Sequence, residues 1–211
     1  MENYQITLEK EIEKIRKTDK KPRLLIHACC APCSSYVLEY LKEIFDITLF
    51  FYNPNISPRS EFEMRFSELK RLNEETESGA DILKGNYDYS EFLEIAKGME
   101  DAPEGGKRCF RCYRLRLRKT AEEALKGGFD YFTTTLSISP YKNAEKLNAI
   151  GKELSEEFGV KYLFSDFKKK NGYKRSIELS KRYGLYRQDY CGCAFSKQEA
   201  EKKRQDNLPQ I

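Results

Sequence analysis

Seven cysteines gather in three short clusters, and no other feature constrains this chain as much. The clusters are Cys29-Cys30-Ala-Pro-Cys33, Cys109-Phe-Arg-Cys112 and Cys191-Gly-Cys193. Thiolates this close together repel one another unless a cation or a cluster shares their charge. Seven ligands exceed the needs of one tetrahedral metal. Four suit an iron-sulfur cluster or zinc, and three leave a second metal with a position open for substrate.

Disulfide bonds are the main alternative use of these cysteines. They need an oxidising compartment, which a secreted chain reaches through an apolar signal segment. The segment from Met1 to Lys20 is polar and highly charged, so the sequence predicts no secretory signal and a reduced, cytoplasmic location. The cysteine pattern therefore favours metal sites over disulfide bonds.

Length and composition indicate one domain with a substantial core. The chain has 211 residues, of which 39% are hydrophobic. No stretch approaches the ~20 apolar residues that a membrane span needs, so no membrane partner is expected. We expect a single metal-binding α/β domain over residues 1–211, in which residues 1–21 form an N-terminal helical extension.

Positive charge is concentrated in two stretches that adjoin the cysteine clusters. Residues 105–119 carry seven Lys or Arg and no acid, and residues 161–204 carry thirteen against five Asp or Glu. The interleaved tyrosines are Tyr113, Tyr173, Tyr183, Tyr186 and Tyr190. Either stretch alone is typical of a solvated helix face. Together, beside the proposed metals, they favour a polyanionic partner such as RNA.

Short apolar runs alternate with amphipathic stretches along most of the chain. The expected strands span residues 23–27, 46–52, 81–84, 129–135 and 160–164. Helices are expected near the N-terminus and over residues 34–41, 58–73, 89–97, 109–126, 143–158, 173–183 and 195–204. Such alternation predicts an α/β fold with a mainly parallel sheet, helices on both faces and a basic helical C-terminal part.

The first cysteine cluster directly follows the first expected strand. Ser34 and Ser35 are suited to cap the helix that comes next. The cluster then lies at the carboxyl end of a strand and the amino end of a helix, where backbone amides and the helix dipole stabilise thiolates. Parallel α/β sheets build their sites at this edge.

Six longer motifs resemble one known family, the QueH-type epoxyqueuosine reductases, over nearly the whole chain after Pro22. They are His27-Ala-Cys-Cys-Ala-Pro-Cys-Ser34, Tyr52-Asn-Pro-Asn-Ile56, Arg108-Cys-x-x-Cys-Tyr113, Thr133-Thr-Thr-Leu-x-x-Ser-Pro-Tyr141, Asp166-Phe-Lys-Lys-x-x-Gly-Tyr173 and Arg187-Gln-x-Tyr-Cys-Gly-Cys193. The resemblance implies a Rossmann-like (HUP-type) sheet akin to that of tRNA-thiolating enzymes. It also implies a 4Fe-4S cluster beside a mononuclear iron, and an oxidoreductase that converts epoxyqueuosine in tRNA to queuosine. Neither cobalamin nor ATP is expected, and an electron donor protein is required.

Candidate roles follow from that chemistry, which consumes two electrons and two protons and releases the oxygen as water. Proton donors or orienting groups are expected at His27, Asp189, Tyr190 and Tyr141. Substrate-binding residues are expected at Lys107, Arg108, Arg111, Arg114, Lys168, Lys169, Lys170, Tyr173 and Arg187, and Tyr186 is a second candidate to stack on a loop base. Buried core tyrosines are an equally good interpretation of Tyr173 and Tyr186.

The cysteines are expected to divide between two centres. Neighbouring side chains in an extended chain point in opposite directions, so Cys29 and Cys30 are assigned to different centres. We place the cluster on Cys30, Cys109, Cys112 and Cys191, and the lone iron on Cys29, Cys33 and Cys193. The assignment within each adjacent pair is open to reversal.

Two other function classes compete with the reductase. An ATP-dependent tRNA thiolase shares the sheet and RNA binding, but its first loop is a glycine-rich phosphate cradle, whereas this loop is Cys-Cys-Ala-Pro-Cys. A non-enzymatic zinc module that binds RNA predicts zinc, no colour and no redox activity. A visible spectrum of anaerobically purified protein separates all three.

Overall fold

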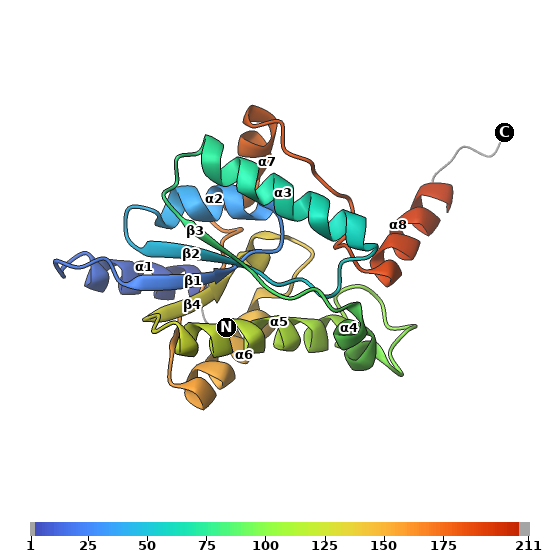
Figure 1. Cartoon of the computed structure of the whole chain (residues 1–211), viewed down its shortest axis with the longest axis horizontal. Helices are drawn as coiled ribbons and strands as arrows, with labels where there is room; N and C mark the ends of the chain where they lie inside the picture. The colour runs from blue at the N-terminus through green and yellow to red at the C-terminus, as the bar shows by residue number, and fades with distance from the viewer. Residues whose placement is uncertain (1–2, 207–211) are drawn as a thin grey trace.

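The computed structural model describes residues 3–206 and shows an α/β fold built on one parallel sheet (Figure 1). The strands are β1 (Arg23–His27), β2 (Asp46–Phe51), β3 (Asp81–Lys84), β4 (Tyr131–Thr134) and β5 (Lys161–Tyr162). They lie in the order β3-β2-β1-β4-β5, and every neighbouring pair is parallel. The Rossmann-like α/β class expected from the sequence is confirmed.

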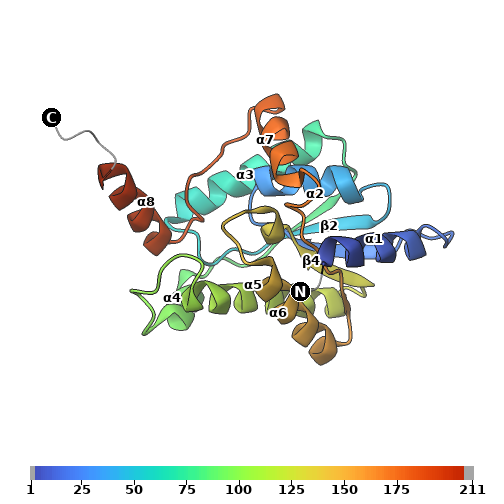
Figure 2. The same ribbon diagram turned by 180° about the vertical axis from the view of Figure 1, so that it is seen from behind.

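Helices cover both faces of this sheet (Figures 1 and 2). Their bounds are α1 (Tyr4–Ile15), α2 (Ala31–Leu41), α3 (Arg59–Glu75), α4 (Tyr89–Ala96), α5 (Lys107–Lys126), α6 (Ala144–Phe158), α7 (Gly172–Arg182) and α8 (Ala194–Asp206), with a short 3-10 helix η1 (Thr135–Ile138) after β4. Helices α2, α3 and α7 lie on one side, and α4, α5 and α6 lie on the other. Helices α7 and α8 are the basic C-terminal part that the sequence predicted.

Strand β1 shows why the sheet needs two helical layers. Leu24 and Ile26 pack into one core, with side chains of α1, α2 and α3, while Leu25 packs into the other, with side chains of α5 and α6. Successive residues of a strand point to opposite faces, so an unbroken apolar run such as Leu24–Ile26 needs cover on both sides. Its central position in the sheet follows from this double burial.

Helix α1 is part of this core. Leu8 and Ile12 are buried in the same cluster as β1, and the Tyr131 hydroxyl of β4 donates to Glu11 at 2.7 Å. Lys170, before α7, forms an ion pair with Glu9. The segment predicted as an N-terminal extension therefore supports the sheet from one side, although Met1 and Glu2 lie outside the described residues.

The strand order creates a switch point at the centre of the sheet. From β1 the order runs to β2 and β3 on one side and to β4 and β5 on the other. The segments that follow β1 and β4 diverge there, which leaves a crevice at the carboxyl edge of the sheet. The first cysteine cluster follows β1, and η1 follows β4. Within residues 3–206, no helix is both long and apolar enough to cross a membrane.

Candidate metal and substrate site

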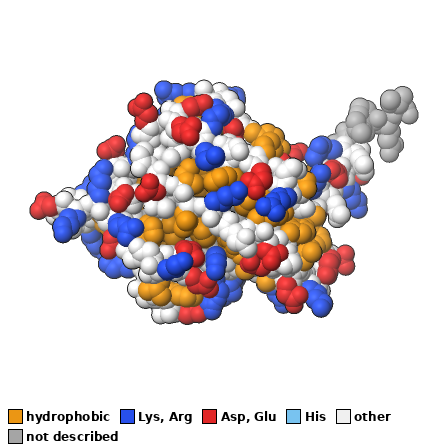
Figure 3. All heavy atoms as spheres, in the orientation of Figure 1, with side chains coloured by type: hydrophobic (Ala, Val, Ile, Leu, Met, Phe, Trp, Pro, Cys, Tyr) orange, Lys and Arg blue, Asp and Glu red, His pale blue; other side chains and the backbone are white. Residues whose placement is uncertain are grey.

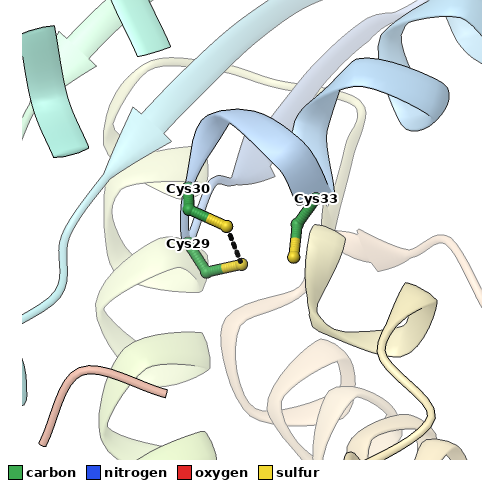
Figure 4. Close-up of side chains that lie close together, drawn as sticks. All are labelled: Cys29, Cys30 and Cys33. Carbon is green, nitrogen blue, oxygen red and sulfur yellow. Dashed lines mark hydrogen bonds between the residues drawn. The ribbon is translucent and has the colours of Figure 1, made fainter. Parts of the chain in front are cut away.

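Three cysteines at the end of β1 form one compact group. The sulfurs of Cys29, Cys30 and Cys33 all lie within 4.8 Å of one another, and those of Cys29 and Cys30 are 3.8 Å apart. Figure 4 shows the side chains of Cys29 and Cys30 side by side, with that of Cys33 facing them from the first turn of α2. We call Cys29, Cys30 and Cys33 the three-cysteine group.

The local chain explains this geometry. Cys30 is the N-cap of α2 and is fully extended, with φ −171° and ψ 166°, and Pro32 lies in the first turn. Proline at this position starts the helix early, at Ala31. Ser34 and Ser35 are therefore not caps, as the sequence had suggested. Their hydroxyls donate instead to the backbone carbonyls of Cys30 and Pro32, both at 2.9 Å.

The three thiols compete for one negative charge. Hydrogen bonds from Cys30 and Cys33 hold the pKa of Cys29 well below its usual value, and the Arg116 guanidinium lowers it further. The same contacts with Cys29 raise the pKa of Cys30 to about 12 and raise that of Cys33 as well. Three thiolates at this spacing need a cation to share their charge, and this is the behaviour of a metal site.

The other four cysteines line a second, inner cavity between α5 and the segment before α8. They are Cys109, Cys112, Cys191 and Cys193, which we call the four-cysteine group. The sulfurs of Cys191 and Cys193 lie 3.6 Å apart. Gly192 between them has φ +108°, and a Cβ there would lie 3.0 Å from Arg65 and from Ile56, so the turn requires glycine.

Backbone amides point at two of these sulfurs. The amide of Gly105 donates to Cys109 Sγ at 3.2 Å, and that of Ser196 donates to Cys193 Sγ at 3.4 Å. Hydrogen bonds of this kind stabilise thiolates and tune the potential of iron-sulfur clusters. Within residues 3–206 every cysteine has a free thiol. Four cysteines that line one cavity, three of them buried and two with amide donors, fit the requirements of a cluster.

These groups differ from the division that the sequence suggested. Cys30 lies with Cys29 and Cys33, and Cys193 lies with Cys109 and Cys112. The opposite orientation of neighbouring side chains holds within a regular strand, but β1 ends at His27, two residues before Cys29. The turn into α2 brings both sulfurs to the same side.

An outer cavity of about 420 Å³ opens onto the three-cysteine group. Its walls include expected site residues, namely Tyr141, Tyr173, Arg187, Asp189 and Tyr190. Cys191 lines this cavity and the inner one, so the two thiol groups share a wall. The three-cysteine group therefore faces a space large enough for a small ligand or a single nucleotide base.

A family model described as "Epoxyqueuosine reductase QueH" matches residues 24–199 of this chain. Proteins of that name from Streptococcus pyogenes and Staphylococcus epidermidis are each 41% identical, over 92% of this chain and 78% and 84% of their own lengths. The protein of that name from Thermotoga maritima is 40% identical over 85% of this chain and 93% of its own.

The chain belongs to the QueH family of epoxyqueuosine reductases. The resemblance read from its motifs is confirmed, and the chain is an oxidoreductase of the QueH type.

In this QueH family member, His27 lies behind the cysteines and not among the residues that line the outer cavity. It is fully buried, and its Nδ1 lies 2.9 Å from the Thr134 hydroxyl. Arg116 Nε, which is always a donor, lies 3.1 Å from His27 Nε2, and the carbonyl oxygen of Tyr52 lies 3.1 Å from the same nitrogen. Burial and the charge of Arg116 lower the pKa of His27 to about 3. The ring is neutral and orients Arg116.

Several expected substrate-binding residues do not line the outer cavity, namely Lys107, Arg108, Arg111, Arg114, Lys168, Lys169 and Lys170. Arg108 differs most from the expectation, because its side chain is only 1% exposed. Its guanidinium donates to the carbonyls of Met99 and Glu100 and to the carboxylate of Glu199. It joins α5 to α8 and is not available to phosphate.

Some of the exposed basic residues are paired with acids. Arg114 pairs with Glu153 of α6, and Lys168 pairs with Asp166 at 2.7 Å. On the face shown in Figure 3, blue and red side chains are interspersed without a patch of one sign. Part of the basic character of the sequence is therefore neutralised by neighbouring carboxylates.

Sequence reasoning missed three buried cations that line the outer cavity: Arg65, Arg116 and Lys142. Burial lowers the pKa of Lys142, but the charges of Cys191, Tyr113 and Glu104 outweigh it and raise the pKa above its usual value. Helical spacing was the available signal for Arg116, which follows Cys112 by four residues on α5 and so shares its face.

Proposed function

We propose that this chain reduces the epoxide of epoxyqueuosine in tRNA to give queuosine, with a 4Fe-4S cluster in the four-cysteine group and a mononuclear iron in the three-cysteine group. One observation carries the proposal. Cys191 of the four-cysteine group lines both the inner cavity and the outer cavity onto which the three-cysteine group opens. A reduction needs a site for electrons and a site for the departing oxygen, side by side.

The residues fit both metals. The four-cysteine group, in which two sulfurs have amide donors, would hold a cluster, and the three-cysteine group, which lines the outer cavity, would hold a mononuclear iron. When bound, the cluster supplies electrons one at a time and the iron acts as a Lewis acid towards the epoxide oxygen. Cys29 and its neighbours hold that iron, and they do not need to enter the reaction themselves.

The balanced reaction defines what else the site must do. Two electrons and two protons enter, both carbon–oxygen bonds of the epoxide break, a carbon–carbon double bond forms and the oxygen leaves as water. A one-electron donor protein supplies the electrons. We assign proton transfer to groups that line the outer cavity, Asp189, Tyr190 and Tyr141, and we retain His27 as the residue that orients Arg116.

Substrate contacts are assigned on the same basis. Arg187 and Tyr173 line the outer cavity, and the Arg187 guanidinium lies 5.8 Å from the centre of the Tyr173 ring. We propose that they hold the modified nucleotide. Lys107, Arg111 and Lys169 remain candidates for contacts with the anticodon stem-loop backbone, and Tyr186 for stacking. We place the reaction in the cytoplasm, where thiols stay reduced.

Anaerobic reconstitution with iron and sulfide is the first test. We expect a brown protein with about five irons per chain, four in the cluster and one mononuclear. Stoichiometric zinc without iron or acid-labile sulfide would instead support an RNA-binding zinc module.

The decisive assay gives the reduced protein a tRNA that carries epoxyqueuosine and identifies the nucleoside by mass spectrometry. We expect the loss of one oxygen to form queuosine, with iron and a reductant but without added ATP or cobalamin. A Cys33→Ser variant is the matched control, because it removes one ligand of the three-cysteine group and leaves the four-cysteine group whole. An unchanged epoxide with fully reconstituted, reduced protein, or a requirement for ATP, would overturn the proposal.

A further inference from the structure

Arg116 differs from the other buried cations of this protein. Within residues 3–206, Arg65 pairs with Glu61 at 2.7 Å, Arg108 with Glu199 at 3.3 Å, and Lys142 with Glu104 at 2.8 Å. Arg116 is only 4% exposed, and it forms no ion pair with a carboxylate of the described residues. A buried charge without a counter-charge costs several kcal/mol, so its compensation must come from other groups.

Neutral acceptors hold the Arg116 guanidinium in place. Nε donates to His27 Nε2 at 3.1 Å, and Nη2 donates to Asn53 Oδ1 at 2.5 Å. The amide of Asn53 is itself fixed, because its Nδ2 donates to the carbonyl of Ala28 at 2.9 Å. His27 ends β1 and Asn53 follows β2 by two residues, so the sheet determines where the charge lies. They orient the charge and leave it uncompensated.

The charge lies between the two thiol groups. Arg116 Nη1 is 4.0 Å from the sulfur of Cys112, which precedes it by one turn of α5. On the other side, Arg116 lines the outer cavity together with Cys29, Cys30 and Cys33. Arg116 also lines both the outer and the inner cavity. The thiolates of the two groups are therefore the counter-charges of this guanidinium.

We propose that Arg116 is a positioning residue whose permanent charge, shared by the two thiol groups, raises the reduction potential of the cluster held by the four-cysteine group. This inference rests on the proposed function, because it assumes a cluster at that site. A reduced cluster carries one more negative charge than an oxidised one, and a nearby cation in a low-dielectric interior stabilises the reduced form. The proposal predicts that electrons enter the cluster more easily because Arg116 has no carboxylate partner.

Arg116→Gln tests the charge directly. The variant is reconstituted anaerobically, its iron and sulfide are counted, and its cluster is titrated with dithionite while electron paramagnetic resonance is recorded without substrate. One electron enters the cluster in this step and no bond breaks. We expect the variant to hold as much cluster iron and sulfide as the parent. Its equilibrium constant for reduction should be at least tenfold smaller, which corresponds to a potential lower by about 59 mV.

Three further variants separate charge from shape. Arg116→Lys keeps the charge but loses the planar guanidinium group. We expect the equilibrium constant for reduction of its cluster to stay within tenfold of the parent value. Asn53→Asp keeps the arginine and gives it the carboxylate partner that the other buried cations have, so the potential should fall as in Arg116→Gln. Arg118→Gln is the matched control, because Arg118 lies on the exposed side of α5 and pairs with Glu157 at 2.5 Å.

Two outcomes would overturn the inference. One is a parental potential in both Arg116→Gln and Asn53→Asp with the cluster fully loaded. The other is loss of the cluster in Arg116→Gln and in Arg116→Lys alike, which would show that the site needs the shape of the side chain. Because the titration contains no substrate, it is independent of the proposed reaction. If the parent reduces no epoxyqueuosine yet the potential still shifts, the function fails and this inference stands.

Discussion

The three-cysteine group and the four-cysteine group differ in how the chain assembles them. Residues 29–33 supply the first group from one continuous turn between β1 and α2. The second group joins the start of α5 to the segment before α8, with most of the fold between them in sequence. The first is therefore a product of local geometry, while the second exists only when α8 is docked. Metal binding at the second group should be coupled to tertiary structure.

The contacts that dock α8 support this difference. Arg108 of α5 bonds Glu199 of α8, and its guanidinium lies 4.4 Å from the centre of the Phe195 ring. Phe195 also packs against Phe92 of α4, with ring centroids 6.1 Å apart. Figure 1 shows α8 at the end of the molecule opposite α1, outside the two helical layers. Few other elements hold α8, so the four-cysteine group is the more easily disrupted of the two.

The largest expected effect comes from breaking the four-cysteine group. Cys112→Ser should lose the cluster chromophore and at least about a hundredfold of activity, since even residues that only support ligands cost about 10- to 100-fold. Visible absorption, sulfide content and the tRNA assay measure it. Cys33→Ser should also lose at least about a hundredfold of activity, but it should keep the cluster chromophore. If Cys33→Ser also bleaches, the two groups do not act as separate centres.

Cys30→Ser sharpens the comparison, because the sequence and the structure assign Cys30 to different centres. Cys30 lies beside Cys29 and Cys33, so we expect this variant to hold four irons per chain and to keep the cluster spectrum. Its activity in the tRNA assay should fall about a hundredfold. The matched variant is Cys193→Ser, which should bleach the cluster. Loss of the cluster spectrum in Cys30→Ser, with the spectrum retained in Cys193→Ser, would restore the division expected from the sequence.

Metal removal tests the coupling to tertiary structure. We expect chelation to increase amide hydrogen exchange in α8 at least about tenfold, because the four-cysteine group helps to hold that helix. Amides of α2, whose first turn carries Cys33, should change little, since the helix is buried against the sheet by Val37 and Leu38. Mass spectrometry measures the exchange. An equal increase in amide exchange in α2 and α8 would contradict the distinction between a local and an assembled group.

The smallest expected effect concerns the outer cavity and not the metals. Arg187→Gln should weaken tRNA binding and reduce the slope of log affinity against log salt by about one, as expected for one lost phosphate contact. Iron content should not change. Arg118→Gln is the control, because Glu157 already pairs with that guanidinium. A parental salt slope for Arg187→Gln would remove this residue from the tRNA-binding surface.

Local sequence patterns were sufficient for the strands and for the position of the first cysteine cluster. The run Leu24–Ile26 predicted a doubly covered strand, and the structure places it at the centre of the sheet. Hydrophobic periodicity works here because burial on two faces leaves little choice of register or secondary structure. The position of the cysteine turn at the carboxyl edge followed from the same pattern.

Charge was harder to interpret from the sequence. The basic run of α5 looked like a surface for phosphate, yet Arg108 and Arg116 are buried and Arg114 pairs with Glu153 of α6. A helix has several faces, and the sequence alone does not show which of them meets carboxylates from a distant helix. The same uncertainty hid the unpaired charge of Arg116 between the two thiol groups.

The sequence by itself determined the order of strands and helices, the number of thiols and the family, because each depends on residue identity and short spacing. Only the tertiary structure decided which sulfurs lie together in one group and which cations face them. Cys30 turned towards Cys29 because the chain leaves β1 and enters α2 within a few residues, and Cys193 joined Cys109 and Cys112 because α8 docks on α5. The second grouping depends on contacts between segments far apart in the chain, and no local pattern encodes it.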